Sequence, residues 1–307
     1  MRVAIIGFGV MGRIHYRILR AMPGVEVAAV CDPVARPPSE TRWYPDTQAM
    51  LDRERPDLAI VAVPTPLHHD ITRACVKRGV HVFVEKPVAS SVAEARSMIR
   101  AVARARVKSA VGHVERFNPV VQALRQQLAR KKILSISFTR VGHMPPRISG
   151  VGVLTDLAVH DIDLLRFITG RRILRTSVYA SRAIRNHHED SANLSFELDG
   201  GVLATITTNW LTPFKRRKIE VTTADGYFEA DLIAQELREY SAYKDDDTFL
   251  TRPCPVRKGE PLAGELRALV SYLESGKRGD LASLEESLFT LEVIEAGTAR
   301  QRNAGRR

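Results

Sequence analysis

The sequence predicts an α/β fold in two parts: a doubly wound parallel sheet, followed by an α+β domain with an open, mainly antiparallel sheet. Short apolar runs alternate with segments of helical periodicity from residue 1 to about residue 112, which is typical of parallel strands buried on both faces. After Gly112 apolar residues recur at every second position, as in strands with one buried face. A chain of 307 residues has room for both domains.

The first strand–helix–strand unit carries a glycine-rich turn. An apolar run at residues 2–6 leads into the turn, a helical pattern follows at 13–22, and a second apolar run at 25–30 ends at Asp32. The turn itself is Gly7-Phe8-Gly9-Val10-Met11-Gly12. In such a unit the first glycine makes the tight turn, the second lets the backbone approach a pyrophosphate, and the third lets helix and strand pack closely. The spacing therefore predicts a Rossmann unit whose six turn residues bind a dinucleotide at the N-terminus of the helix.

Asp32 indicates which dinucleotide to expect. It lies twenty positions after Gly12, where an acid accepts hydrogen bonds from the adenine ribose hydroxyls. Its charge should repel the 2′-phosphate of NADP, so we expect NAD. Arg36 lies close to Asp32 in a proline-rich stretch, residues 33–38, and leaves NADP as the weaker alternative.

The rest of the first domain, residues 1–113, continues the alternation. Two of its strands end in proline-containing loops, Pro64-Thr65-Pro66 and Glu85-Lys86-Pro87. Open α/β sheets bind ligands at the carboxyl ends of their strands, so these loops and the helix that starts at His68 should border the cofactor. We therefore add Pro64, Thr65, His68, Glu85 and Lys86 to the cofactor site. The further strands are expected at 57–63, 80–84 and 107–111, and the helices at 47–53, 68–77 and 91–104, the last opening with a capping box.

The second domain is expected to span residues 114–307. In residues 191–199 the apolar side chains alternate with polar ones, which predicts a half-buried antiparallel strand. The segments Asp199-Gly200-Gly201 and Asp225-Gly226 predict hairpin turns. Further strands are expected at 133–141, 173–184 and 202–210, and helices at 117–130, 154–168, 260–275 and 284–300.

Two places in the sequence combine groups for acid–base chemistry. In the helix at 154–168, Asp156, His160 and Asp163 fall within about 60° of one another at 100° per residue, so the carboxylate at Asp156 can orient the imidazole. Lys86 follows a strand of the cofactor domain, where a lysine can polarise a reacting oxygen. We expect the cofactor, Lys86 and His160 to converge on one cleft. Asp161 points toward the apolar side of the helix and requires a buried partner.

Three motifs together resemble the Gfo/Idh/MocA family of nicotinamide-dependent sugar oxidoreductases. They are the glycine turn at residues 7–12, Glu85-Lys86-Pro87, and the segment from Asp156 to His160. The resemblance covers nearly the whole chain. It implies that Lys86 and His160 form an acid–base pair around the reacting hydroxyl and that Asp156 orients them. It also implies a homo-oligomer, a dimer or tetramer, that assembles through the exposed face of the second sheet.

A narrower likeness implies the substrate. Residues 112–119, 140–148, 159–163 and 209–213 resemble the family's UDP-N-acetylglucosamine 3-dehydrogenases, which supply a 3-keto sugar for lipid A synthesis. A UDP group suits guanidinium groups, because arginine binds phosphates through paired hydrogen bonds. We therefore expect the substrate to contact Arg116, Asn118 and Arg147 as well as Lys86, Asp156 and His160.

Other functions remain open at this stage. A family dehydrogenase could act on a UDP-sugar uronic acid or on a polyol such as inositol. A family glycosidase keeps NAD bound and uses oxidation at C3 to assist elimination. A non-enzymatic nucleotide sensor should lack the set of Lys86, Asp156 and His160, which this chain has.

Composition narrows the partners. The formal charge is +11, but the lysines and arginines are scattered and aromatic residues make up 6%, so we expect no nucleic-acid partner. No apolar run approaches the roughly 18 residues of a membrane span, and no signal segment opens the chain, so we expect a cytoplasmic protein. The three cysteines are far apart, and neither His68-His69 nor His187-His188 completes a ligand set, so we expect no metal.

Overall fold

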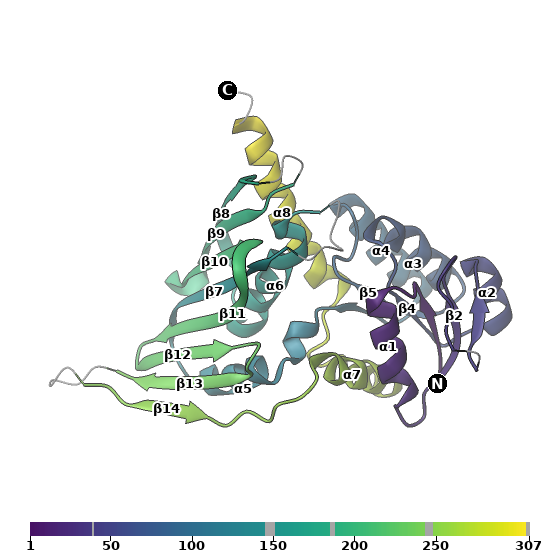
Figure 1. Cartoon of the computed structure of the whole chain (residues 1–307), viewed down its shortest axis with the longest axis horizontal. Coiled ribbons are helices and arrows are strands. Elements are labelled where there is room, and N and C mark those ends of the chain that lie inside the picture. Colours follow the sequence, from purple (N-terminus) through teal and green to yellow (C-terminus); the bar gives the residue numbers. More distant parts are fainter. Residues whose placement is uncertain (39, 145–150, 185–187, 243–247, 305–307) are drawn as a thin grey trace. The chain divides into compact units, whose positions relative to one another are not determined.

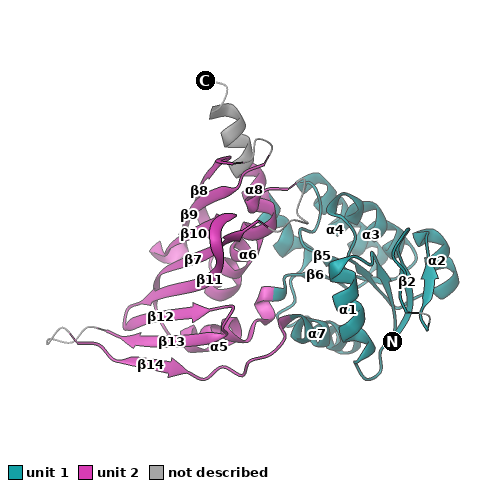
Figure 2. Cartoon of the chain, in the orientation of Figure 1, with its two compact units in different colours: residues 1–114, 262–291 teal, residues 115–261, 292–307 magenta. Residues whose placement is uncertain are grey.

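The computed structural model describes residues 1–38, 40–144, 151–184, 188–242 and 248–304. The chain divides into two compact units (Figure 2). Unit 1 comprises residues 1–114 and 262–291, and unit 2 comprises residues 115–261 and 292–307. The chain thus leaves unit 1, returns to it and leaves it again.

Unit 1 is built on a six-stranded parallel sheet with the order β3-β2-β1-β4-β5-β6 (Figure 1). The order reverses beside β1, which pairs with β2 on one side and β4 on the other. This reversal is the switch point at which doubly wound sheets bind ligands, and it confirms the predicted fold class. The strands are β1 (Arg2–Ile6), β2 (Glu26–Cys31), β3 (Arg42–Tyr44), β4 (Leu58–Val61), β5 (His81–Glu85) and β6 (Ser109–Gly112).

Two helices of unit 1 begin at side-chain caps that the sequence supplies. The side chain of Asp46 accepts from the N–H of Ala49 at 2.8 Å, and Ser91 accepts from the N–H of Glu94 at 3.2 Å. The predicted capping box is thereby confirmed on its serine side. The helices are α1 (Val10–Arg20), α2 (Thr47–Glu54), α3 (His68–Lys77) and α4 (Val92–Ala105), with a 3-10 turn at Thr65–Leu67.

Residues 262–291 also belong to unit 1, although the sequence analysis assigned them to the second domain. They include most of α7 (Pro261–Ser275) and the start of α8 (Leu284–Ala304). The ammonium group of Lys108 donates to the carbonyls of Tyr272 and Leu273 at 3.1 and 2.7 Å, and Val111 forms an antiparallel bridge with Ala282. The apolar face of an amphipathic helix fits either sheet, so periodicity could not decide between them.

Unit 2 is built on an eight-stranded sheet with the order β14-β13-β12-β11-β7-β10-β9-β8. Only the β7–β10 pair is parallel among these strands, so the predicted, mainly antiparallel sheet is confirmed. The strands are β7 (Ile133–His143), β8 (Ile173–Ser181), β9 (Ser191–Leu198), β10 (Leu203–Asn209), β11 (Leu211–Thr223), β12 (Gly226–Asp231), β13 (Glu236–Ser241) and β14 (Thr251–Cys254). The sequence analysis named no strand beyond residue 210.

One face of this sheet is covered by α5 (Pro119–Leu128) and α6 (Val159–Thr169). The predicted alternation in β9 is present: Ala192, Leu194, Phe196 and Leu198 are buried. Asn193 and Ser195, between them, are exposed. The buried side packs beneath the helices and the other side stays open, as expected for an antiparallel sheet with one solvated face.

Candidate active site

The glycine turn after β1 has the geometry of a phosphate cradle. Gly7 has φ +93°, and a Cβ there would lie 2.5 Å from the carbonyl oxygen of Ala62. A Cβ on Gly12 would lie 2.0 Å from the carbonyl oxygen of Gly7, so only glycine lets α1 start this close to the strand. A Cβ on Gly9 would meet nothing within 4 Å. The open side of the turn is therefore at Gly9, where a pyrophosphate needs to approach the backbone.

The N-terminus of α1 differs from those of α2, α4 and α5. Its N-cap, Gly9, provides no side-chain hydrogen bond, whereas Asp46, Ser91 and Asn118 cap α2, α4 and α5. The first amides of a helix lack partners within the helix and carry its positive dipole end. An uncapped helix start beside an open glycine fits the phosphates of a dinucleotide.

Asp32 closes the same turn from the end of β2. Its Oδ2 accepts from the N–H of Phe8 at 2.7 Å, and its Oδ1 accepts from the N–H groups of Val34 and Ala35 at 2.9 and 2.7 Å. Partial burial acts to raise the pKa of Asp32, but these donations and the charge of Arg13 hold it below its usual value. Asp32 is thus a carboxylate at neutral pH. Backbone groups occupy three of its roughly four acceptor positions.

Arg36, the residue that could weaken the preference for NAD, is exposed and stacks on an aromatic ring. Its guanidinium carbon lies 4.0 Å from the centre of the Trp43 ring. The Trp43 indole donates to the carbonyl of Asp32 at 3.0 Å, which fixes the ring beside β2. Trp43 lies in β3, a strand that the sequence analysis missed because prolines dominate the stretch before it.

Two of the residues assigned to the cofactor site turn inward instead. His68 is 1% exposed, and its ring nitrogens lie 2.9 Å from the carbonyl oxygen of Val63 and 3.0 Å from that of Pro87. Burial lowers the pKa of His68, so the neutral ring donates to one of these carbonyls at a time. Glu85 is 8% exposed and pairs with His15. Both residues therefore shape the loops after β4 and β5. Lys86, which follows Glu85, is half-buried.

In unit 2, Asp156 and His160 lie on either side of a change in helix type. Residues Leu154–Ala158 form a π-helical turn that continues directly into α6. Asp156 is in the wide turn and His160 is the second residue of α6, so the assumed 100° per residue does not describe their relation. Single π turns inside helices are frequent at functional sites. Both side chains are half-buried.

Glu189 holds the start of this turn, and no sequence motif pointed to it. Its carboxylate accepts from the N–H of Leu154 at 3.2 Å, and its carbonyl accepts from the N–H of Val153 at 3.0 Å. A Cβ on Gly152 would lie 2.0 Å from that carboxylate. Gly152 and Glu189 thus form a close-packed N-terminal cap for the segment that carries Asp156 and His160.

Asp161 has the buried partner that the helical pattern required. Arg140 in β7 donates from Nε and Nη2 to the Asp161 carboxylate at 2.8 to 3.0 Å, and from Nη1 to Glu115 at 2.9 Å. Burial acts to raise the pKa of Glu115, but the charges of Arg140 and Arg217 hold it below its usual value. The group is an internal charge network that fixes α6 on the sheet.

Arg116 and Asn118, expected at the substrate, are committed to internal contacts. Arg116 is 4% exposed and donates to both oxygens of Asp163 at 2.8 and 2.6 Å. Asn118 is 3% exposed; its amide donates to Glu115 and to the carbonyl of Leu232, and its oxygen accepts from Val120 at the start of α5. Asp163 is consequently part of this ion pair and not of an exposed stripe with Asp156. Arg147 lies outside the described residues.

Arg217 is a candidate for the substrate that sequence reasoning did not single out. It belongs to the basic run at 215–218 in β11, and its side chain is 40% exposed. Its Nη1 lies 3.3 Å from Glu115, and the negative charge of Asp156 acts on it. Burial and the neighbouring Arg140 lower the pKa of Arg217. It is therefore a partly open cation close to the segment with Asp156.

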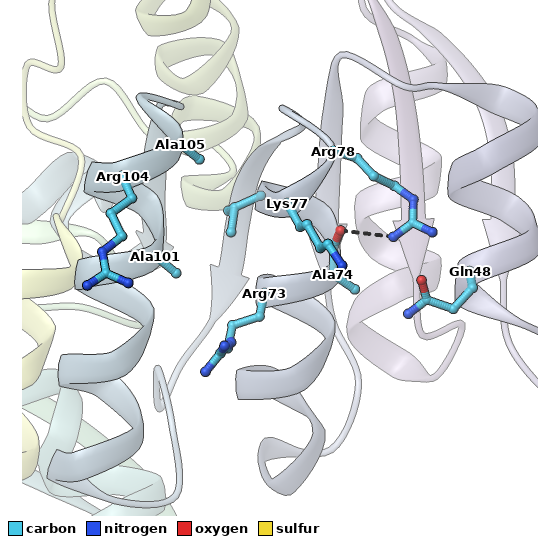
Figure 3. A pocket seen from close by; sticks show the side chains of 9 residues that line it. Gln48, Arg73, Ala74, Lys77, Arg78, Ala101, Arg104 and Ala105 are labelled. Atoms are coloured by element: carbon cyan, nitrogen blue, oxygen red, sulfur yellow. Dashed lines mark hydrogen bonds between the residues drawn. The ribbon is translucent and has the colours of Figure 1, made fainter.

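A hollow of about 680 Å³ on unit 1 has a different character. It lies between α2, α3 and α4 and is lined by Arg73, Lys77, Arg78 and Arg104 (Figure 3). Lys77 and Arg104 sit in the last turns of α3 and α4, where cations complement the carbonyl ends of the helices. Arg78 donates to Asp52 at 2.7 Å. None of the residues that line the hollow belongs to the glycine turn.

Two further observations concern membrane-spanning helices and metal sites. No helix among the described residues is long and apolar enough to cross a membrane. Nor does the described part of the chain bring together three or more metal-binding side chains of the His, Cys, Asp or Glu type.

Comparison with known proteins extends these observations. The model of an oxidoreductase family with an NAD-binding Rossmann fold matches residues 1–113, and the model of the GFO/IDH/MocA C-terminal domain matches residues 92–229. The chain is 26% identical over 247 residues to UDP-N-acetylglucosamine 3-dehydrogenase of Acidithiobacillus ferrooxidans, covering 78% of this chain and 77% of the relative. It is also 26% identical over 328 residues to scyllo-inositol 2-dehydrogenase (NAD(+)) of Bacillus subtilis, covering 99% and 94%.

Solved structures show the same architecture. A crystal form of the Acidithiobacillus ferrooxidans enzyme superposes with a TM-score of 0.87 at 23% identity and covers 96% of each chain. An oxidoreductase from Magnetospirillum magnetotacticum superposes with a TM-score of 0.84 at 25% identity, covering 96% of this chain and 99% of that one. At these identities the likeness establishes the fold.

Proposed function

The chain belongs to the Gfo/Idh/MocA family of NAD-binding oxidoreductases, and on that basis we propose that it oxidises the C3 hydroxyl of UDP-N-acetylglucosamine to the 3-keto sugar. The protein is an NAD-dependent dehydrogenase of sugars or polyols by family. The UDP-linked amino sugar is the more specific part of the proposal, and we expect its product to feed lipid A or another cell-surface glycan.

The chemistry is inferred from the residues at one edge of the sheet of unit 1, where its parallel strands have their carboxyl ends. The open glycine turn, the uncapped start of α1 and the ionised Asp32 lie at the carboxyl ends of the first strands, and Lys86 follows β5 at the same edge. These residues fit a dinucleotide whose pyrophosphate lies on α1 and whose adenine ribose meets Asp32. When bound, NAD supplies a nicotinamide that accepts hydride.

The remaining steps fall to side chains of this chain. We assign Lys86 and His160 to the acid–base pair that binds the C3 hydroxyl and removes its proton. Asp156, four positions before His160, orients this pair. Arg116 donates to Asp163 and is not assigned to the substrate. We assign the diphosphate to Arg217, which is partly exposed.

Two relatives favour different substrates, which makes inositol the second candidate. The match to scyllo-inositol 2-dehydrogenase covers 99% of this chain at the same 26% identity as the match to the UDP-sugar enzyme. A UDP-sugar uronic acid is a third dehydrogenase substrate. A glycosidase that keeps NAD bound would hydrolyse its substrate without net reduction of NAD.

The test is a substrate panel in which turnover is measured by the absorbance of reduced nicotinamide. It contains UDP-N-acetylglucosamine, its uronic acid, free N-acetylglucosamine, and myo- and scyllo-inositol, each with NAD and with NADP. We expect the highest kcat/KM with UDP-N-acetylglucosamine and NAD. Equal or faster reduction with an inositol or with the free sugar would overturn the nucleotide-sugar proposal and leave the family intact.

We also propose that the protein assembles as a homo-oligomer through the open face of the second sheet. Tyr179 in β8 and Leu203 in β10 are 72% and 61% exposed, while the adjacent Val178 and Ala204 are buried on the other face. Light scattering coupled to size exclusion gives the mass directly. A monomer at all concentrations would remove this part of the proposal.

A further inference from the structure

A buried hydrogen-bonded pair of an imidazole and a carboxylate lies next to Lys86. His15 in α1 is 0% exposed, and its Nε2 lies 2.7 Å from Oε1 of Glu85, the last residue of β5. The ring of His15 also packs edge-on against Phe83, with 5.6 Å between ring centres. The pair therefore joins the cofactor-binding helix to the strand that ends at Lys86.

The second oxygen of Glu85 is directed at Lys86 itself. Oε2 accepts from the backbone N–H of Lys86 at 3.3 Å. The space around this oxygen is tight, because a Cβ on Gly112 would lie 3.1 Å from it. One carboxylate thus holds an imidazole with one oxygen and the main chain of Lys86 with the other.

The charge on this carboxylate is maintained in spite of its burial. Burial acts to raise the pKa of Glu85, but the hydrogen bond and charge of His15, together with the charge of Lys86, hold it below its usual value. A buried carboxylate is destabilising unless it is paired, and apolar residues of similar volume often stabilise a fold better. The buried carboxylate of Glu85 is therefore better explained by an effect on its neighbour than by stability.

The loop is held from its other side by His68. That ring contacts the carbonyl of Pro87, immediately after Lys86, and the carbonyl of Val63 at the end of β4. A buried imidazole thus fixes the backbone on each side of Lys86. His15 in α1 acts through Glu85, and His68 in α3 contacts the carbonyl of Pro87.

We propose that His15 and Glu85 are positioning residues that act through Lys86, with His15 compensating the carboxylate so that Lys86 is oriented toward the reaction. The inference rests on the proposed catalytic role of Lys86. Without the donor at Nε2, the buried carboxylate is left to be compensated by the Lys86 ammonium, whose charge already acts on it, and Lys86 turns back toward Glu85.

A double-mutant cycle tests this coupling. His15→Leu should lower kcat about 10- to 100-fold, as small displacements of a catalytic group do, while the Kd for NAD stays within about twofold. In the Lys86→Met background the same substitution should cause no further loss, because the two residues act as a unit. His15→Gln, which retains a donor, should recover part of kcat. Equal losses in both backgrounds would overturn the proposal.

A second readout does not depend on turnover. The rate at which an amine-reactive reagent labels Lys86, measured by mass spectrometry against the exposed Lys77, should fall in His15→Leu and rise in Glu85→Gln. If His15→Leu does not fold, His15→Gln/Glu85→Gln provides a neutral pair of similar shape, and labelling of Lys86 should rise there too. Unchanged labelling in the folded variants would overturn the coupling. If Lys86→Met kept full activity while labelling of Lys86 changed in the His15 and Glu85 variants, the catalytic role of Lys86 would be refuted and the coupling would stand.

Discussion

The two units present their polar residues in opposite ways. In unit 1 the groups that fit the cofactor are mainly backbone: a glycine turn without Cβ atoms, an uncapped helix start, and Asp32 with hydrogen bonds from three amides. In unit 2 most charged side chains near α6 are paired with one another in the interior. A backbone site leaves a spacing signature in the sequence, whereas a charged side chain looks the same whether it binds substrate or supports a helix.

The largest expected effect tests the residues assigned to chemistry. Lys86→Met and His160→Ala should fold and bind NAD but lose turnover by about 10²–10⁴, the usual effect of removing an acid–base group. Asp156→Ala should lose less, since it orients and does not transfer the proton. The measurement is kcat on the best substrate of the panel, with the Kd for NAD from fluorescence quenching. Near wild-type kcat in either of the first two variants would contradict the assignment.

The second prediction separates a structural arginine from a substrate arginine. Arg116→Ala removes both hydrogen bonds that the guanidinium donates to the buried Asp163 carboxylate, which should lower the free energy of unfolding by about 3–5 kcal/mol. The guanidinium carbons of Arg116 and Arg125 lie 4.9 and 4.2 Å from the centre of the Phe167 ring, so Arg125→Ala is the matched control and should cost only about 1 kcal/mol.

Urea unfolding measures both variants, and KM for the sugar substrate is followed in parallel. If Arg116→Ala were stable but raised KM, the original assignment of Arg116 to the substrate would be right and the comparison of the two units would fail.

The third prediction uses two glycines of one turn. Gly9→Ala adds a methyl group to open space, so the melting temperature should be unchanged while NAD binds about tenfold more weakly, or ~1.4 kcal/mol. Gly12→Ala places its methyl group against the carbonyl of Gly7 and should lower the melting temperature as well. Thermal melts with and without NAD distinguish the two. Unaltered NAD affinity in Gly9→Ala would mean that the cofactor does not approach the backbone there.

The smallest expected effect is the pH dependence contributed by Glu115. Its pKa is lowered in the folded protein, so its stabilising contribution is complete above the ordinary glutamate value and is lost as the pH falls through the folded value. One such carboxyl changes the free energy of unfolding by at most about 1.4 kcal/mol per pH unit. Glu115→Gln should flatten the acid side of a stability–pH curve, and a curve of unchanged slope would show that the network is not charged in this way.

The sequence predicted much of unit 1 because each of its signals is local. The glycine spacing, the acid at the end of β2, the apolar strands and the capping box at Ser91 each depend on a few neighbouring residues. What it missed depends on distant partners. The short strand β3 forms where Trp43 packs beside Asp32, and Asp161 finds Arg140 across 21 positions.

The helix with Asp156 and His160 shows the limit of periodicity most clearly. A regular α-helical projection groups Asp156, His160 and Asp163, but a π turn at Leu154–Ala158 changes the first angle and Arg116 removes Asp163 from the group. The turn begins at a cap made by Glu189, which is 35 positions from the amide that it accepts. Nothing in the local sequence reports a partner at that distance.

The return of residues 262–291 to unit 1 bears on how such a protein can be rearranged in evolution. The cofactor-binding unit is not one continuous stretch, since residues 262–291, which lie between the two parts of unit 2 in the chain, belong to it. A gene fragment that ends after β6 would encode the glycine turn, Asp32 and Lys86 without the segment that covers Lys108 and Val111. Exchange of the second unit between family members therefore has to replace both residues 115–261 and the stretch from residue 292 onward, and is not the fusion of two independent domains.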